Sequence, residues 1–131
     1  MFEVEVISSG ENVALGKSAT QSSTFKNKKG FSASKAVDGQ MDRFSHTDRN
    51  DECAWWTVDL GSAVEVESVK IHNRWCREES ESDKCLCRLS FAAVSLLNDR
   101  NKWVEATMTG NTCGVLEWEH NFTASADNCP E

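Results

Sequence analysis

Short segments in which apolar and polar residues alternate constrain the fold of this chain more than any other feature. In residues 2–6, Phe and Val alternate with two glutamates, and in residues 116–122 apolar or aromatic residues alternate with Glu117, Glu119 and Asn121. A period of two predicts strands with one buried face. No heptad and no sustained helical stripe is present. We therefore predict an all-β sandwich, with further strands expected within residues 55–60, 64–71 and 89–97 and one helical turn at 34–37.

Six cysteines in a chain of 131 residues indicate an oxidising compartment, and therefore a secreted or cell-surface protein with about three disulfides. The zinc alternative is weak, because Cys85 and Cys87 are the only closely spaced pair. Asn121 begins a sequon for N-glycosylation on the predicted outer face of its strand. The start at Met1 is expected to be a boundary cut into a longer precursor.

Size and charge exclude several function classes. The length fits one domain, which we assign to residues 1–131. A net charge of −7 argues against a nucleic-acid partner and against electrostatic docking on anionic lipid. The chain contains neither a GxSxG nor an HExxH motif, so no enzyme class is indicated.

Six motifs in a fixed order make the sequence more informative than its composition. They are NVALGKSATQSS from Asn12, FSASKAVDGQ from Phe31, FSHT from Phe44, WWTVDLGS from Trp55, VKIHNR from Val69 and RLS from Arg88. This series resembles the coagulation-factor type C, or discoidin-like, superfamily, and within it the fucose-binding F-type lectins. The resemblance implies a jelly-roll β-sandwich of about eight antiparallel strands, with its ligand loops clustered at one end.

The resemblance also implies a structural calcium ion. In the family, a tight loop collects backbone and side-chain oxygens, which suits the six to eight oxygen ligands that calcium takes. The matching positions are the carbonyls of Lys35 and Gln40, together with Asp38 and Ser45. The alternative for Asp38 is that it only caps its own turn.

A Glu-Val-Glu-Val run that usually forms the last strand in this family stands here at the beginning, within residues 1–6. A repeat excised with a shifted boundary and a natural permutation both explain this position. Either way, Glu3 becomes a candidate calcium ligand. The alternative is an ordinary strand with exposed carboxylates.

For the sugar site, the resemblance points to His46, Arg74 and Arg88, which we expect to converge. Arginine presents a rigid fork of donors that can hold two vicinal hydroxyls, and histidine adds one directional contact. Trp75 is a candidate stacking platform. The alternatives are a surface ion pair for Arg74, a local hydrogen bond for His46 and a solvated strand end for Arg88.

The match departs from the family at one important place. Arg74-Trp75-Cys76 replaces an Arg-x-Asp motif, so the carboxylate that orients the arginine is missing. An acidic insertion follows, from which Asp83 or Glu81 could fold back to take its place. Cys76 could form a disulfide with Cys85 or Cys87.

The resulting prediction is a calcium-supported carbohydrate-binding module, with fucose as the candidate sugar and glycans or glycoproteins as partners. The alternative is a discoidin-like adhesion domain that uses the same loops to bind a protein or glycoprotein. Because a single sugar site is usually weak, a tandem-repeat or oligomeric arrangement is expected to supply avidity.

Overall fold

The computed structural model describes residues 1–76 and 83–122. Within these residues the fold is mostly β, as predicted. The strands are β1 (Glu3–Ser8), β2 (Glu11–Asn12), β3 (Ser18–Gln21), β4 (Trp56–Asp59), β5 (Ser68–His72), β6 (Ala93–Leu97), β7 (Trp103–Met108) and β8 (Glu117–Asn121).

The main sheet has the order β2-β1-β5-β8, and all of its neighbouring strands are antiparallel. Val4 of β1 pairs with Ile71 of β5, which in turn pairs with Trp118 of β8. Val4, Val6 and Ile71 are buried. These side chains share one face because strand residues two apart point the same way, so the alternation seen in the sequence becomes one wall of the core.

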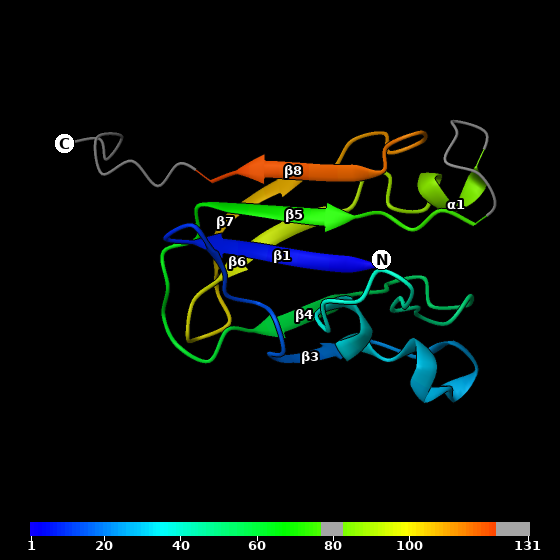
Figure 1. Ribbon diagram of the computed structural model, residues 1–131, viewed down its shortest axis with the longest axis horizontal. Helices are drawn as coiled ribbons and strands as arrows, with labels where there is room; N and C mark the ends of the chain where they lie inside the picture. Colours follow the sequence, from blue (N-terminus) through cyan, green and yellow to red (C-terminus); the bar gives the residue numbers. More distant parts are fainter. Residues whose placement is uncertain (77–82, 123–131) are drawn as a thin grey trace.

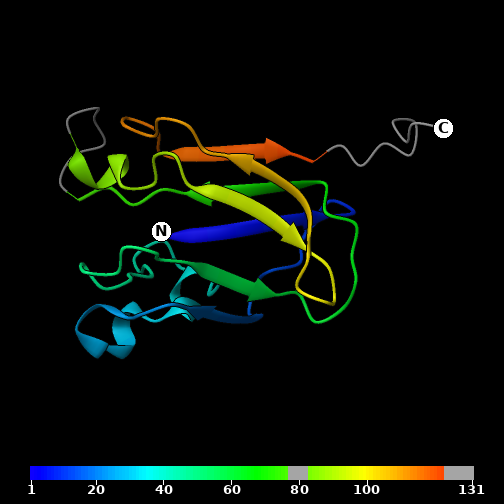
Figure 2. The same ribbon diagram turned by 180° about the vertical axis from the view of Figure 1, so that it is seen from behind.

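Two two-stranded antiparallel sheets complete the sandwich. β6 and β7 cross one face of the main sheet, and β3 and β4 lie alongside β1 (Figures 1 and 2). Val94 and Leu96 of β6 pack on the same buried cluster as Val4 and Val6. Fully burying a valine or leucine side chain contributes about 1.5–3 kcal/mol, so this shared cluster holds the layers together. The arrangement is an antiparallel β-sandwich, as the resemblance implied.

Two strand boundaries differ from the sequence prediction. The expected strand at 64–71 begins only at Ser68, and Val64 and Val66 lie in the preceding loop. The expected strand at 89–97 begins at Ala93, because Phe91 before it has a left-handed φ of 59° that a strand cannot continue through.

Helical structure in the described chain is confined to single turns. They are η1 (Phe25–Asn27), η2 (Lys29–Phe31), η3 (Ala33–Ala36) and α1 (Lys84–Cys87). The helical turn predicted at 34–37 is confirmed as η3. Trp56 donates its indole N–H to the Ala33 carbonyl at 2.9 Å, which ties η3 to β4. None of the described helices has the length and hydropathy that a bilayer-spanning segment requires.

The loops are divided between the two ends of the sandwich. The N-terminus, the 3-10 turns and α1 gather at one end, whereas the turn between β6 and β7 lies at the other (Figure 1). Residues of four predicted motifs, from the segments around 31–46 and 73–88, therefore meet at the first end.

Candidate functional site

His46 is held at the loop end by backbone hydrogen bonds on both sides. Its N–H donates to the Phe31 carbonyl at 3.0 Å, and its own carbonyl accepts from the Phe25 N–H at 2.9 Å. The Gln21 side-chain amide also donates to the Phe31 carbonyl at 3.0 Å. The imidazole lies 4.5 Å from the Phe25 ring and 6.3 Å from the Phe44 ring, measured between centroids. His46 is therefore positioned by packing as well as by local hydrogen bonds.

The protonation of His46 follows from its contacts. Nδ1 donates to the Thr47 carbonyl, since a carbonyl can only accept. Burial lowers the pKa of His46 below 6.5, and the positive charges of Arg74 and Arg88 lower it further. The ring is thus neutral at pH 7, and its Nε2 atom is an acceptor that a ligand hydroxyl can use.

Arg74 follows β5 and lies against the ring of Phe44. Its guanidinium carbon is 4.0 Å from the centroid of Phe44, within cation–π range. Burial and the neighbouring charge of Arg88 lower the pKa of Arg74, while the Asp83 carboxylate raises it. Within the described ranges Arg74 forms no ion pair with a carboxylate. Most of the acidic insertion that was the expected ion-pair partner, residues 77–82, lies outside the described ranges.

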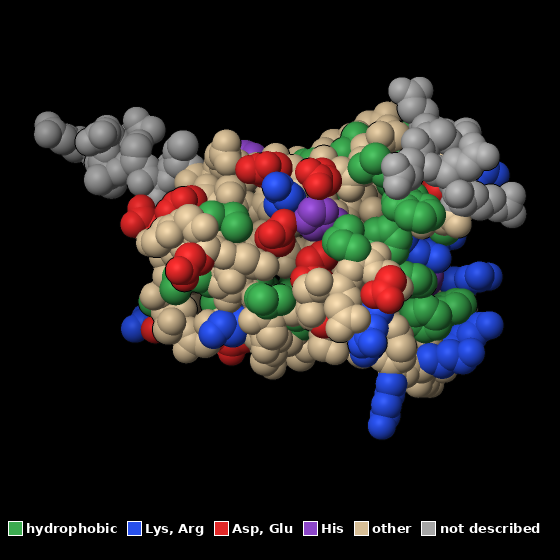
Figure 3. Space-filling view, in the orientation of Figure 1, with side chains coloured by type: hydrophobic (Ala, Val, Ile, Leu, Met, Phe, Trp, Pro, Cys, Tyr) green, Lys and Arg blue, Asp and Glu red, His purple; other side chains and the backbone are tan. Residues whose placement is uncertain are grey.

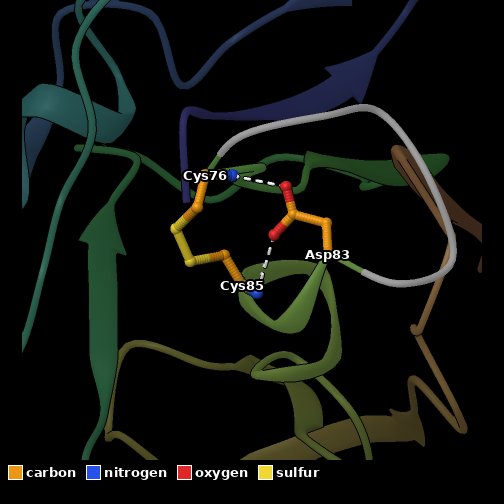
Figure 4. A group of neighbouring side chains, drawn as sticks. All are labelled: Cys76, Asp83 and Cys85. Carbon is orange, nitrogen blue, oxygen red and sulfur yellow. Dashed lines mark hydrogen bonds between the residues drawn. A yellow bond between two sulfur atoms is a disulfide. The ribbon is translucent and has the colours of Figure 1, made fainter.

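Asp83 lies where the sequence analysis looked for a substitute carboxylate. It is buried, and its two oxygens accept from the Cys76 N–H at 2.6 Å and the Cys85 N–H at 2.9 Å. Figure 4 shows it between the two cysteines, which form a disulfide. The pairing of Cys76 with Cys85 is therefore confirmed. The other candidate carboxylate, Glu81, lies outside the described residues.

The pairing of the cysteines bears on whether any of them could bind zinc. Cys87 forms a disulfide with Cys113, so Cys85 and Cys87 bind different partners. Cys76, Asp83 and Cys85 are close enough to hold a metal, but both sulfurs are in the disulfide and no thiolate remains for zinc. Cys53 is exposed and unpaired within the described chain, and Cys129 lies outside it.

Asn73 is a site-positioning residue that the sequence analysis missed. It is buried, its amide donates to the carbonyls of Leu86 at 2.8 Å and Val115 at 3.0 Å, and its Oδ1 accepts from the Arg74 N–H at 2.9 Å. It thereby joins the end of β5 to α1 and to the segment before β8. The available signal was a polar side chain directly after an apolar strand, next to the candidate arginine.

Arg88 and Trp75 flank the same region. Arg88 is the C-terminal cap residue of α1 and is exposed, and its charge acts on both His46 and Arg74. Trp75 is 39% exposed, and its ring meets Phe2 edge-on at 5.8 Å. Both side chains are available to a ligand at this end of the sandwich.

The side chain of Glu3, on β1, contacts the loop that contains Asp38. Its Oε2 accepts from the Gly39 N–H at 2.7 Å, and Gly39 has a φ of +75°, which favours glycine. Glu3 is only 5% exposed, so the alternative of an exposed carboxylate was wrong for this residue. Burial raises the pKa of Glu3, and the nearby Asp38 carboxylate raises it further.

The side-chain oxygens of Glu3 and Asp38 are suited to binding a cation. Glu3 Oε1 and Asp38 Oδ2 are both buried without a hydrogen-bond partner in the described chain. Arg43 Nη1 is 3.9 Å from Asp38 Oδ2, beyond hydrogen-bond distance. Buried carboxylate oxygens without partners, here one on the buried Glu3 and one on the partly exposed Asp38, are costly unless a cation compensates them. The residues present therefore suit calcium, which prefers oxygen ligands.

The other positions expected around calcium lie on the same loop. Asp38 Oδ1 accepts from the Gln40 N–H at 2.9 Å, the capping contact foreseen as the alternative for Asp38, which leaves Oδ2 for another role. Lys35 lies in η3. Ser45 is buried, and its N–H donates to the Met1 carbonyl at 3.0 Å, which holds the start of β1 to the loop.

Asn121 is exposed at the end of β8, on the face predicted from the alternation, and the threonine of its sequon lies outside the described residues.

Comparison with known proteins agrees with this geometry. A family model described as NedA-like, galactose-binding domain, of the F5/F8 type C group, matches residues 35–126. Fucolectin-3 of Anguilla japonica is 43% identical over 92 residues, which are 64% of this chain and 46% of that protein. The chain thus spans about half the length of this curated relative.

Two solved structures resemble the chain over most of its length. The lectin domain of lectinolysin, complexed with Lewis b antigen, is 37% identical with a TM-score of 0.73, covering 91% of this chain and 81% of that one. A histidine mutant of the same lectin domain, also complexed with Lewis b, is 36% identical with a TM-score of 0.72, covering 90% and 80%.

Proposed function

Since the chain belongs to the NedA-like, galactose-binding domain family of F5/F8 type C domains, and is an F-type lectin-like member of it, we propose that it is a secreted, calcium-supported lectin that binds fucose. The observation that carries the proposal is the cationic cluster at the loop end. There the charges of Arg74 and Arg88 act on a neutral His46, beside exposed aromatic surface.

Each residue has a distinct part in sugar binding. Arg74 and Arg88 donate hydrogen bonds to neighbouring hydroxyl or ring oxygens, and His46 Nε2 accepts from a hydroxyl. Trp75 covers an apolar C–H face of the sugar. Asp83 supplies the electrostatic support for Arg74 that the missing Arg-x-Asp carboxylate would otherwise give.

Calcium has a structural part in the proposal. Glu3 and Asp38 contribute side-chain oxygens, Lys35 and Gln40 contribute carbonyls, and Ser45 completes the set. When bound, calcium compensates the charges of the buried Glu3 and the partly exposed Asp38. The chain's own contacts, Glu3 to Gly39 and Ser45 to Met1, then hold β1 against the loop that carries His46.

A glycan array probed with the folded protein, with calcium and with a chelator, tests the function. We expect binding to fucosylated glycans, and loss of that binding in Arg74→Ala with an unchanged circular dichroism spectrum. Arg100→Ala, in the turn between β6 and β7, is the matched control and should bind as the wild type does. Absence of glycan binding by folded protein at high loading would rule out the lectin proposal.

The adhesion alternative predicts a different result with a glycoprotein partner. If the loops recognise a protein surface, binding survives enzymatic removal of the partner's glycans. If they recognise sugar, binding is lost and free fucose competes. The membership of the family and the relatives crystallised with Lewis b favour the sugar.

A further inference from the structure

Two cationic side chains lie over one aromatic ring next to His46. Lys26 Nζ and Arg49 Cζ are each 5.2 Å from the centroid of the Phe25 ring. The same ring lies 4.5 Å from the His46 imidazole. Both cations are therefore close to the sugar site, at a distance that a second sugar residue of an oligosaccharide can reach.

The backbone that presents Lys26 is strained and tied in place. Lys26 and Asn27 have left-handed φ values of 52° and 51°, which non-glycine residues rarely adopt. The Phe25 N–H donates to the His46 carbonyl at 2.9 Å, and the Gln21 amide donates to Thr24 Oγ1 at 3.0 Å. Such strain persists where the surrounding contacts over-determine a conformation, and it concentrates at ligand-binding sites.

Neither cation is neutralised by a neighbouring carboxylate. In the described parts of the chain, the only Lys and Arg residues in ion pairs are Arg43 and Lys70. The nearby Asp51 carboxylate accepts instead from the hydroxyls of Ser22 and Ser23 and from the Cys53 N–H. Lys26 and Arg49 are exposed, so their charge is available to a ligand.

This local charge runs against the acidic character of the whole chain. The net charge is −7, yet blue side chains gather at the loop end of the molecule in Figure 3, while red ones lie mainly over the main sheet. Lys28 and Lys29 follow Lys26 in the same segment and are also exposed. Charge of one sign collected on one surface attracts ligands of the opposite sign, whatever the total.

We propose that Lys26 and Arg49 form a second subsite, which binds the carboxylate or sulfate of an acidic glycan while its neutral fucose occupies the site of His46, Arg74 and Arg88. This inference rests on the proposed lectin function. Arg49 offers a planar fork suited to two oxygens of one anionic group, and Lys26 adds a point charge over the same aromatic ring. The shared contact with the Phe25 ring keeps the two cations near each other and near His46.

The experiment compares one fucosylated oligosaccharide in three forms by calorimetry: neutral Lewis a, sulfated Lewis a and sialylated Lewis a. The variant is Lys26→Gln with Arg49→Gln, which removes both charges but keeps stems that can cover Phe25. The control is Arg100→Gln with Lys102→Gln, in the turn at the opposite end of the sandwich (Figure 1).

We expect the wild type to bind at least one acidic form about fivefold more tightly than the neutral form at low salt, the size expected for two exposed charge contacts. The preference should shrink as salt is added, because exposed charges are screened. It should disappear in the Lys26→Gln, Arg49→Gln variant and persist in the control. Whichever acidic form is preferred identifies the anionic group as carboxylate or sulfate.

Three results would overturn the inference and leave the lectin proposal standing. The first is equal affinity for the neutral form and both acidic forms. The second is a preference for an acidic form that survives in the Lys26→Gln, Arg49→Gln variant, because that preference would then belong to Arg74 and Arg88. The third is that the two charges strengthen binding to anionic phospholipid vesicles but do not change the affinity for glycans. If none of the three sugars binds to the folded wild type, the proposed function itself fails.

Discussion

Replacing Glu3 by glutamine separates the buried charge of this residue from its shape. Among the residues that the structure describes, Glu3 Oε1 and Asp38 Oδ2 both lack hydrogen-bond partners. A glutamine can keep the contact to the Gly39 N–H with its oxygen and offer its amide N–H to Asp38. Leaving a buried polar atom unsatisfied costs about 1–3 kcal/mol. We therefore expect Glu3→Gln to be more stable than the wild type, by about 1–2 kcal/mol, when calcium is chelated.

With calcium the order of stability should reverse. Calcium at a hundredfold excess over its dissociation constant stabilises the native state by about 2.7 kcal/mol. For a domain of this size that corresponds to a rise in Tm of about 10 °C. The variant lacks one carboxylate ligand and should lose most of this rise. Differential scanning fluorimetry of both proteins, in chelator and in a calcium series, measures the crossover.

The pH dependence of the calcium-free protein gives an independent check. Burial raises the pKa of Glu3 above its ordinary value of 4.5, so the native state holds this proton when the unfolded state has released it. Stability is therefore expected to fall as pH rises from 4.5 through the native pKa, and this component is absent in Glu3→Gln. Glu5→Gln is the matched control, because Glu5 lies on the same strand and contacts His72 instead. A wild-type Tm that is the same in chelator and calcium, or a calcium shift that survives in Glu3→Gln, would refute the reasoning.

Three further predictions concern the sugar site. Because burial lowers the pKa of His46 below 6.5, fucose binding should weaken as pH falls, with a midpoint below 6.5, as Nε2 gains a proton. Titration calorimetry across pH measures this, and a midpoint above 6.5 would contradict the neutral-acceptor role. Asn73→Ala removes three hydrogen bonds of a buried amide, so it should lower the free energy of unfolding by about 2–4 kcal/mol and weaken sugar binding. Denaturant unfolding measures the change in stability, and a change under about 1 kcal/mol would show that the amide does not join β5 to α1. Replacing Cys76 and Cys85 together by serine should lower the free energy of unfolding by about 2–3 kcal/mol, the value for a short disulfide loop. It should also lower sugar affinity, because Arg88 caps α1, which contains Cys85. An unaltered affinity would mean that the disulfide does not position the arginine.

Parts of the site could be predicted from the sequence because they depend on local order. His46, Arg74 and Arg88 stand in motifs of adjacent residues, and in the folded protein the charges of both arginines act on His46 while that of Arg88 acts on Arg74. Asp83 was foreseen as one of two carboxylates near Arg74. Asn73 was not foreseen, because its role depends on the carbonyls of Leu86 and Val115, which are far from it in the chain.

The placement of Lys26 and Arg49 over Phe25 could not be predicted from the sequence. A net charge of −7 is an average over the whole chain and argued only for solubility and against polyanionic partners. It does not reveal that Lys26 and Arg49, which are more than twenty residues apart, share one ring. Only folding of the 3-10 turns against the His46 segment brings them together.

The sequence by itself determined the all-β character of this protein, the faces of its strands and the order of its motifs. Strand alternation is a property of the extended backbone, so a period of two can be read without knowing any partner. The tertiary structure decided which polar residues are buried and which charges meet. Glu3 is the clearest example: the sequence left a calcium ligand and an exposed carboxylate as alternatives, and only the structure shows that the side chain is buried against the Gly39 N–H, with one oxygen unpaired among the described residues. Burial depends on what packs over a residue, and that is set by contacts between segments that are distant in the chain.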